Sequence, residues 1–412
     1  MLEYLNVKII TGKNIDIKTG FYLSIVLCVS VMFTLFVPLN GLRAQANFTL
    51  FILCALHGIG NIKNLHTNSW KKLFWTAIFA FIIFLYKIMN ISSASWGYIT
   101  RYEEWCFYIF IGLFLDYFFS SKQKKTIFNS ILLISDISII YVCIATMRNI
   151  HVVDAPYSTM MMIFYGNCII WFLSTDNRNE KRVSLFSAFI SAFGIIVVLQ
   201  KATNSILLAI MTLLILTMKN KNIFVIKIML IVFGCLVLFL YYSELYVNLL
   251  RFLGDISRSD RLAERFNRLI VAIQYQDFKK GGGSLSGRYQ LIELSINTWI
   301  TNQHTIFFGV GDHRNGQYIG NHGEAFDTLG RYGVLGGFIL MRVLLLHYKE
   351  LFQRRYRESG FVQRGIICVF TFYIIRTFFG LTLIPETAIQ LFVFTPLLIE
   401  HCLKMQRKQD II

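Results

Sequence analysis

Long apolar runs, separated by short polar segments, follow one another along most of this chain. A helix that crosses a bilayer needs about 20 mostly apolar residues, and windows of that length give about twelve candidate spans. They lie near residues 21–38, 47–60, 73–87, 105–119, 127–147, 158–173, 183–199, 203–218, 223–242, 332–346, 365–380 and 387–402. The pattern predicts an all-α polytopic membrane protein with about twelve transmembrane helices.

One large polar segment interrupts this series. It divides the chain into residues 1–242 with spans one to nine, residues 243–331 as a large loop, and residues 332–412 with spans ten to twelve and a tail. Residues 44–46, Ala-Gln-Ala, follow the first apolar run and resemble a signal-peptidase site. That run is long for a signal peptide, so we interpret it as a retained signal anchor.

Lysines and arginines gather in every second connection between the predicted spans. Basic residues mark the cytoplasmic side of a membrane protein. The alternation therefore predicts that both termini are cytoplasmic and that the loop 243–331 and the connections after spans one, three, five and seven lie outside. Those four short outer connections carry little positive charge, with Arg43, Arg101, Arg148 and Lys201.

The composition supports this interpretation. Hydrophobic residues make up 55% of the chain and Asp, Glu, Lys and Arg only 15%, more apolar surface than a soluble protein of this length can bury. The basic cytoplasmic connections account for most of the net charge of +17, so no nucleic-acid partner is needed to explain it. The eight cysteines lie in or beside apolar runs, without a C-x-x-C motif, and we expect them to pack as small apolar residues.

The outer loop is predicted to contain an amphipathic helix over residues 256–280. A cationic stripe and an apolar stripe lie side by side on it, so it would rest on the membrane interface with its apolar side down. The two stripes comprise Arg258, Arg261, Arg265 and Arg268, and Leu262, Phe266, Leu269 and Ile273. The arginines would bind either anionic lipid headgroups or a phosphate-bearing substrate. A second helix is predicted over residues 288–301, with Ser286 as its N-cap.

Several catalytic signatures are absent from the sequence: Asp-x-Asp, the P-loop and His-Glu-x-x-His. We therefore expect neither a metal nor a cofactor. Arginine, which matches phosphate oxygens in pairs, and histidine, which can accept a proton from a sugar hydroxyl, remain at the outer face. Arg288 and His322 are the best candidates for transferring a glycan from a lipid diphosphate. Alternatively, Arg288 is a solvated residue at a helix start and His322 caps a loop.

Four further ionisable residues are candidates on the same side. Glu324 and Asp327 follow His322, and would orient it, act as the base themselves, or simply favour the start of a helix. Arg376 lies near the outer end of span eleven and Lys201 in the turn after span seven. Both would bind substrate or extend to lipid headgroups.

The segment around His322 resembles a known motif. Residues 321–324, Asn-His-Gly-Glu, together with residues 332–336, Tyr-Gly-Val-Leu-Gly, are similar to the histidine–glycine motif of the bacterial O-antigen ligase and polysaccharide polymerase superfamily. The upstream residues 286–289, Ser-Gly-Arg-Tyr, and 306–311 resemble the same family's outer loop. The likeness covers roughly residues 284–340, and the predicted topology agrees over the whole chain.

The resemblance implies a metal-independent glycosyltransferase of the multi-span type, which uses glycans linked to undecaprenyl diphosphate. Arg288 would contact the diphosphate, and His322 would activate or position the acceptor. Two residues depart from the family pattern: Gly323 follows the histidine, and Asn204 stands where the family often has an arginine. These departures favour a repeat-unit polymerase for O-antigen or capsule over a ligase.

The polymerase would act in the cytoplasmic (inner) membrane, with membrane lipid and a chain-length regulator as further partners. One alternative is the O-antigen ligase, which transfers finished polymer to lipid A core. Another is a polysaccharide flippase or transporter, which predicts several charged residues deep within the spans and two similar halves. Asp136 and Arg342 are the ionisable residues that would fit such a path.

Overall fold

The computed structural model describes residues 17–36, 42–58, 67–89, 101–148, 154–199, 202–218, 244–256, 260–274, 283–311, 319–320, 323–351, 360–378, 380 and 382–409. Within these ranges the chain forms helices and no β-strand. The predicted all-α class is therefore confirmed.

The helices form a main body and a smaller group. The main body comprises α2 (Ile17–Leu35), α3 (Arg43–Gly58), α4 (Thr67–Met89), α5 (Arg101–Phe118), α6 (Ser121–Met147), α7 (Asp154–Ser174), α8 (Arg178–Phe193), the π-helix η3 (Gly194–Val198), α9 (Ala202–Met218), α15 (Glu324–Leu351), α17 (Gly360–Thr377), α18 (Pro385–Ala388), the π-helix η4 (Ile389–Phe394) and α19 (Thr395–Gln409). The smaller group comprises α11 (Glu244–Ile256), α12 (Asp260–Gln274), α13 (Gly283–Ile300) and α14 (Gln303–Phe308).

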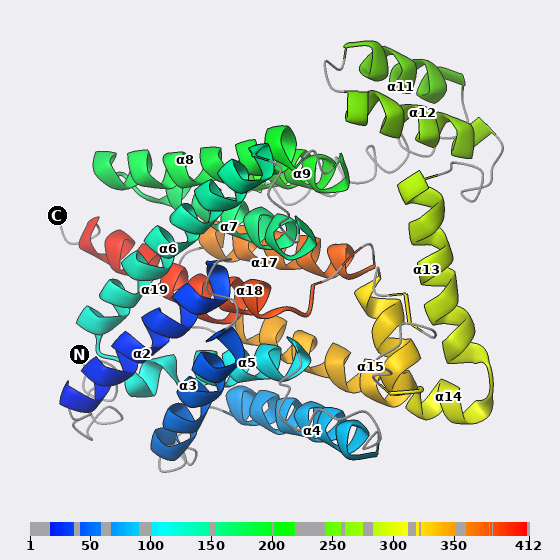
Figure 1. The fold of residues 1–412 in the computed structure, drawn as a ribbon. Helices are drawn as coiled ribbons and strands as arrows, with labels where there is room; N and C mark the ends of the chain where they lie inside the picture. Colours follow the sequence, from blue (N-terminus) through cyan, green and yellow to red (C-terminus); the bar gives the residue numbers. More distant parts are fainter. Residues whose placement is uncertain are drawn as a thin grey trace.

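The main body has two distinct ends. In Figure 1 the start of α2 and the end of α19 lie on the left, whereas α11–α14 lie on the right. Ion pairs join the ends of several elements: Arg101 of α5 to Glu324 of α15, Arg43 of α3 to Glu386 of α18, and Lys124 of α6 to Glu400 of α19. We call the end with α11–α14 the loop end and the other the tail end.

Four helical segments in the described part of the chain are long and apolar enough to cross a membrane: Ser121–Met147, Arg178–Val198, Glu324–His347 and Pro385–Leu403. Shorter apolar helices cover Gly20–Leu35, Arg43–Leu56 and Leu207–Met218. These segments support a membrane protein. The number of about twelve spans is not confirmed, because several predicted spans form helices shorter than the ~20 residues that a bilayer requires. The predicted span 223–242 lies outside the described residues.

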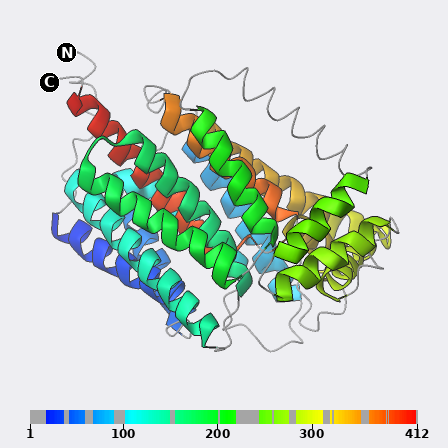
Figure 2. The same cartoon turned by 90° about the horizontal axis from the view of Figure 1, so that it is seen from above.

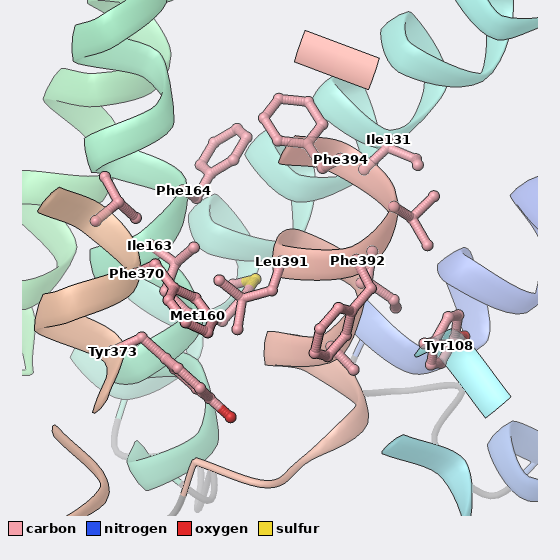
Figure 3. Close-up of a cluster of buried hydrophobic side chains, with 14 of the residues drawn as sticks. Tyr108, Ile131, Met160, Ile163, Phe164, Phe370, Tyr373, Leu391, Phe392 and Phe394 are labelled. Atoms are coloured by element: carbon pink, nitrogen blue, oxygen red, sulfur yellow. The ribbon is translucent and has the colours of Figure 1, made fainter. Parts of the chain in front are cut away.

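The last helix occupies the middle of the bundle. In the segment Pro385–Leu403, which spans α18, η4 and the start of α19, 83% of the apolar window is buried. In the segment Arg178–Val198 the buried share is only 33%, so α8 lies at the periphery. Figure 3 shows Phe392 and Phe394 of η4 among buried apolar side chains of α6, α7 and α17. Exposed side chains of α8 such as Phe186 and Phe189 are apolar, as expected for a helix that faces lipid.

The amphipathic helix of the loop differs in part from the prediction. It begins at Asp260 and ends at Gln274, and it packs against α11 in a hairpin beside the bundle (Figures 1 and 2). Phe266 and Ile270 contact Val247 and Leu250 of α11. This part of the apolar side is therefore covered by protein rather than by the predicted membrane interface, because α11 offers an apolar face of its own.

Candidate functional site

A break in α15 attaches the loop to the bundle. Gly333, in the middle of α15, has φ +63° and ψ −167°, which interrupts the helical hydrogen bonds. In a continuous helix the carbonyls of Gly330 and Arg331 would accept from amides four residues further on. Here they accept from the amides of Val310 and Gly311, at 3.0 and 2.8 Å. The segment after α14 is thereby bonded directly to the first part of α15.

The same contact requires glycine on both sides. A Cβ atom at Gly333 would lie 2.3 Å from the carbonyl carbon and oxygen of Phe307. A Cβ atom at Gly309, which has φ +73°, would lie 2.3 Å from the backbone of Arg331. Only glycine populates such conformations readily. Gly309 and Gly333 thus allow the two backbones to come into direct contact.

Glu324, the first residue of α15, is the centre of a buried polar cluster. Its Oε1 accepts from the Tyr102 hydroxyl at 2.7 Å and forms an ion pair with Arg101 Nη2 at 3.2 Å. Its Oε2 accepts from the backbone amides of Thr382 and Leu383, at 3.1 and 3.2 Å. Only 1% of the Glu324 side chain is exposed, so this carboxylate is fully engaged by protein donors.

Arg331 completes what we call the Glu324 cluster: Arg101, Tyr102, Glu324 and Arg331. Arg331 Nη1 donates to the Tyr102 hydroxyl, and its guanidinium lies 5.3 Å from the centre of the Tyr102 ring. The guanidinium of Arg101 lies 4.9 Å from the same ring. Two arginines therefore flank one tyrosine, a geometry in which the aromatic face offsets part of their mutual repulsion.

Asp327 holds the chain on both sides of residue 322. Its Oδ1 accepts from Ser295 Oγ of α13 at 2.6 Å, and Ser295 Oγ in turn accepts from the amide of Gly320 at 2.9 Å. Its Oδ2 accepts from the amide of Gly323 at 3.3 Å. Gly320 and Gly323 are thus tied to one carboxylate, and His322 lies in the chain between them.

Arg376, near the end of α17, lies next to the start of α15. It is 7% exposed, and a Cβ atom at Gly380 would lie 2.3 Å from its Nη1. The carbonyl of Gly380 accepts from the amide of Glu324 at 3.3 Å. Arg376 therefore belongs to the protein interior beside the Glu324 cluster, and does not extend to lipid headgroups as one interpretation of the sequence suggested.

A second buried ionic group lies at the same end of the bundle. Arg43 pairs with Glu104 at 3.2 Å and with Glu386 at 3.3 Å, and Asn47 Nδ2 donates to Glu104 at 3.3 Å. These residues begin or lie near the first turns of α3, α5 and α18. Together with the Glu324 cluster they form a layer of buried charge that closes the apolar core at the loop end.

The remaining predicted residues are described in part. His322, Arg258 and Lys201 lie outside the described residues. For Arg288, Arg261 and Arg265 the structure describes the helices to which they belong, α13 and α12, and not their side chains. Helix α13 packs against α15, so the backbone of Arg288 belongs to a helix that also carries Ser295.

Glu324 and Asp327 both lie in the first turn of α15, where acids favour the start of a helix, and an orienting or basic role toward His322 stays a prediction. Arg101, Tyr102 and Arg331 were not singled out from the sequence as site residues. For Arg101 a signal existed, since it is one of few basic residues in the outer connections. Nothing in the sequence pattern linked it to Glu324, which lies more than 200 residues further along.

Asn204 is fully buried near the start of α9, and its side-chain amide has no hydrogen-bond partner within the described parts of the chain. Within those parts, no group of three His, Cys, Asp or Glu side chains is placed to hold a metal ion. No protein-family profile matches this chain, and no curated protein matches its sequence.

Proposed function

We propose that this protein is a polymerase that joins oligosaccharide repeat units, linked to undecaprenyl diphosphate, into O-antigen or capsular polysaccharide. It acts from the outer face of the cytoplasmic (inner) membrane, with about twelve spans and both termini in the cytoplasm. The observation that carries the proposal is the network of Asp327, which ties Gly320 and Gly323 and so restrains the chain on both sides of His322. A catalytic side chain needs such support to hold its geometry.

The reaction is a glycosyl transfer. A hydroxyl oxygen of the acceptor repeat unit forms a bond to the anomeric carbon of the donor, and the bond from that carbon to the diphosphate oxygen breaks. His322 takes the hydroxyl proton, and undecaprenyl diphosphate leaves with the bonding electrons. Arg288 neutralises the charge that develops on the diphosphate, a task that fixed arginines can perform without a metal.

The other predicted residues have supporting roles in this proposal. Asp327 positions the histidine segment through Gly323, and Glu324 fixes the start of α15, which follows that segment directly. Arg376, buried beside Gly380, contributes positive charge at the same end of the bundle. Arg258, Arg261, Arg265 and Lys201 would bind the donor lipid or neighbouring headgroups from the outer side.

In a deletion strain, the wild-type gene should restore long polysaccharide chains, whereas His322→Ala or Arg288→Ala should restore none. Each variant removes a group that acts in the transition state, and loss of general-base catalysis alone costs about 10²–10⁴-fold in rate. Gel analysis of extracted glycans measures the chain lengths, and immunoblots verify that each variant inserts. His304→Ala and Arg251→Ala, which change exposed residues of α14 and α11, are the matched controls and should leave the ladder intact.

The accumulated product identifies the enzyme. Loss of a polymerase leaves lipid A core that carries a single repeat unit, whereas loss of a ligase leaves bare core together with lipid-linked polymer. Undiminished ladders from both His322→Ala and Arg288→Ala would refute the proposed site. Bare core in the deletion strain would refute the polymerase in favour of the ligase.

A further inference from the structure

A cavity of about 260 Å³ lies at the tail end of the bundle, opposite the Glu324 cluster. The first turns of α6 and the last helix, α19, form its walls. Lys122, Lys124 and Lys125 line it from α6, and Glu400 and His401 line it from α19. The size suits a phosphate group with a small substituent rather than a drug-sized ligand, for which pockets usually exceed about 300 Å³.

The cavity carries an excess of positive charge. Lys124 Nζ and Glu400 Oε2 form an ion pair at 3.0 Å, which balances one lysine against the one acid among the described lining residues. The side chains of Lys122 and Lys125 are exposed, and their two charges exceed that balance. The Nε2 atom of His401 lies 3.0 Å from Oε2 of Glu180, an acid that is not part of the cavity lining.

The neighbouring acid, Glu180, is already engaged. It also accepts from Trp171 Nε1 at 3.1 Å and from Thr175 Oγ1 at 3.3 Å. The carboxylates packed around His401 are thus committed to donors of the protein itself. The cavity therefore keeps a net positive charge, which favours the binding of an anion from outside the protein.

The position of the lysines on their helix strengthens this conclusion. Helix α6 has 27 residues and no acid in its first turn, although acids are favoured at the positive end of a helix dipole. Ser120 caps the helix through the amide of Gln123, and the lysines follow directly. Cations at this end raise the energy of the helix, and a bound anion would remove that penalty.

The inner wall of the cavity is apolar. Phe128 is buried, and its ring stacks on His401 with centroids 5.1 Å apart and planes 16° apart. Leu397, also buried, lines the same wall. A cationic rim around an apolar wall matches a ligand that carries a phosphate on an apolar or partly apolar body, and basic pockets between membrane helices bind anionic lipid headgroups in this way.

We infer that the cavity between α6 and α19 binds a phosphate group, supplied either by the headgroup of an anionic phospholipid or by a soluble phosphorylated compound. Lys122 and Lys125 supply the charge, and Lys124, held by Glu400, fixes the rim. This binding site is separate from the proposed glycan site, because it lies at the opposite end of the bundle. It stands or falls independently of the polymerase function.

The test uses the purified full-length protein. Native mass spectrometry measures the binding of phosphatidylglycerol and of phosphatidylcholine with the same acyl chains, and a thermal-shift titration measures the effect of inorganic phosphate. The pocket variant is Lys122→Gln/Lys125→Gln. The matched control is Lys71→Gln/Arg182→Gln, which removes two exposed basic residues at the tail-end starts of α4 and α8 and leaves the cavity intact. Both variants change exposed side chains and should fold.

The wild type should bind phosphatidylglycerol in preference to phosphatidylcholine, and the pocket variant should bind it about 30-fold more weakly, from two lysines at the membrane surface. The control variant should bind as the wild type does. Stabilisation by inorganic phosphate, lost in the pocket variant and without preference between the two lipids, would identify a soluble source of the phosphate. Equal losses in the two variants, or no binding of either probe to the wild type, would overturn the inference.

Discussion

Replacing Glu324 with alanine should destabilise the protein by about 3–5 kcal/mol, because it removes the buried carboxylate that pairs with Arg101. Arg101 and the Tyr102 hydroxyl would lose the oxygen that they share. The backbone amides of Thr382 and Leu383, which are both buried, would also lose their acceptor, and an unsatisfied buried donor costs about 1–3 kcal/mol. We expect little folded protein in the membrane and, as a consequence, no long glycan chains.

The measurement is the midpoint of thermal unfolding in detergent, with the yield of inserted protein beside it. Glu264→Gln removes a carboxylate that is 59% exposed and pairs with Arg268 four residues along α12. This control should change stability by about 0.3–0.5 kcal/mol. A Glu324→Gln/Arg101→Gln double variant should lose less than the two single changes together, because it removes both charges of the pair. Additive losses would contradict the ion pair as the source of the effect.

The largest effect of backbone geometry is expected at Gly333. Alanine there should undo the attachment of α14 to α15, because the new Cβ would meet the backbone of Phe307 at 2.3 Å, and a backbone contact cannot be relieved by a rotamer change. The conformation itself, φ +63° with ψ −167°, adds about 1–3 kcal/mol for a residue with a side chain. We expect the amides of Val310 and Gly311 to lose their bonds to α15.

Limited proteolysis and thermal unfolding measure this effect, with cleavage expected in the segment after α14. Gly287→Ala is the matched control. A Cβ atom at Gly287 would meet nothing within 4 Å, and alanine in α13 should be neutral or stabilise the helix by about 0.5–1 kcal/mol. If Gly333→Ala were as stable and as resistant to protease as Gly287→Ala, the break in α15 would not be what holds the loop.

These two predictions separate support from chemistry. Glu324 and Gly333 stabilise α15, the helix that follows His322 in the sequence. Their replacement should lower the stability of the protein, and glycan synthesis should fail as a consequence. His322→Ala is expected to leave stability unchanged while it abolishes long chains. A variant of His322 that unfolds the protein would instead indicate that the histidine is a structural residue.

The sequence alone determined the class of the fold. Runs of about 20 apolar residues have no stable arrangement in lipid other than a helix with its own hydrogen bonds satisfied. The alternation of basic connections predicted an orientation in the membrane, which stays a prediction. The amphipathic character of α12 was equally evident, since periodicity reports the faces of a single helix.

Only the tertiary structure decided which residues meet. Arg101 and Glu324 are far apart in the sequence, and their pairing depends on the starts of α5 and α15 lying together, with α4 packed against both helices, which no local pattern encodes. The apolar side of α12 faces α11 rather than a membrane because two amphipathic helices can cover each other. The break at Gly333 likewise arises from contact with a second backbone. Local propensity describes one segment at a time, whereas burial and charge pairing are settled between segments once they are packed together.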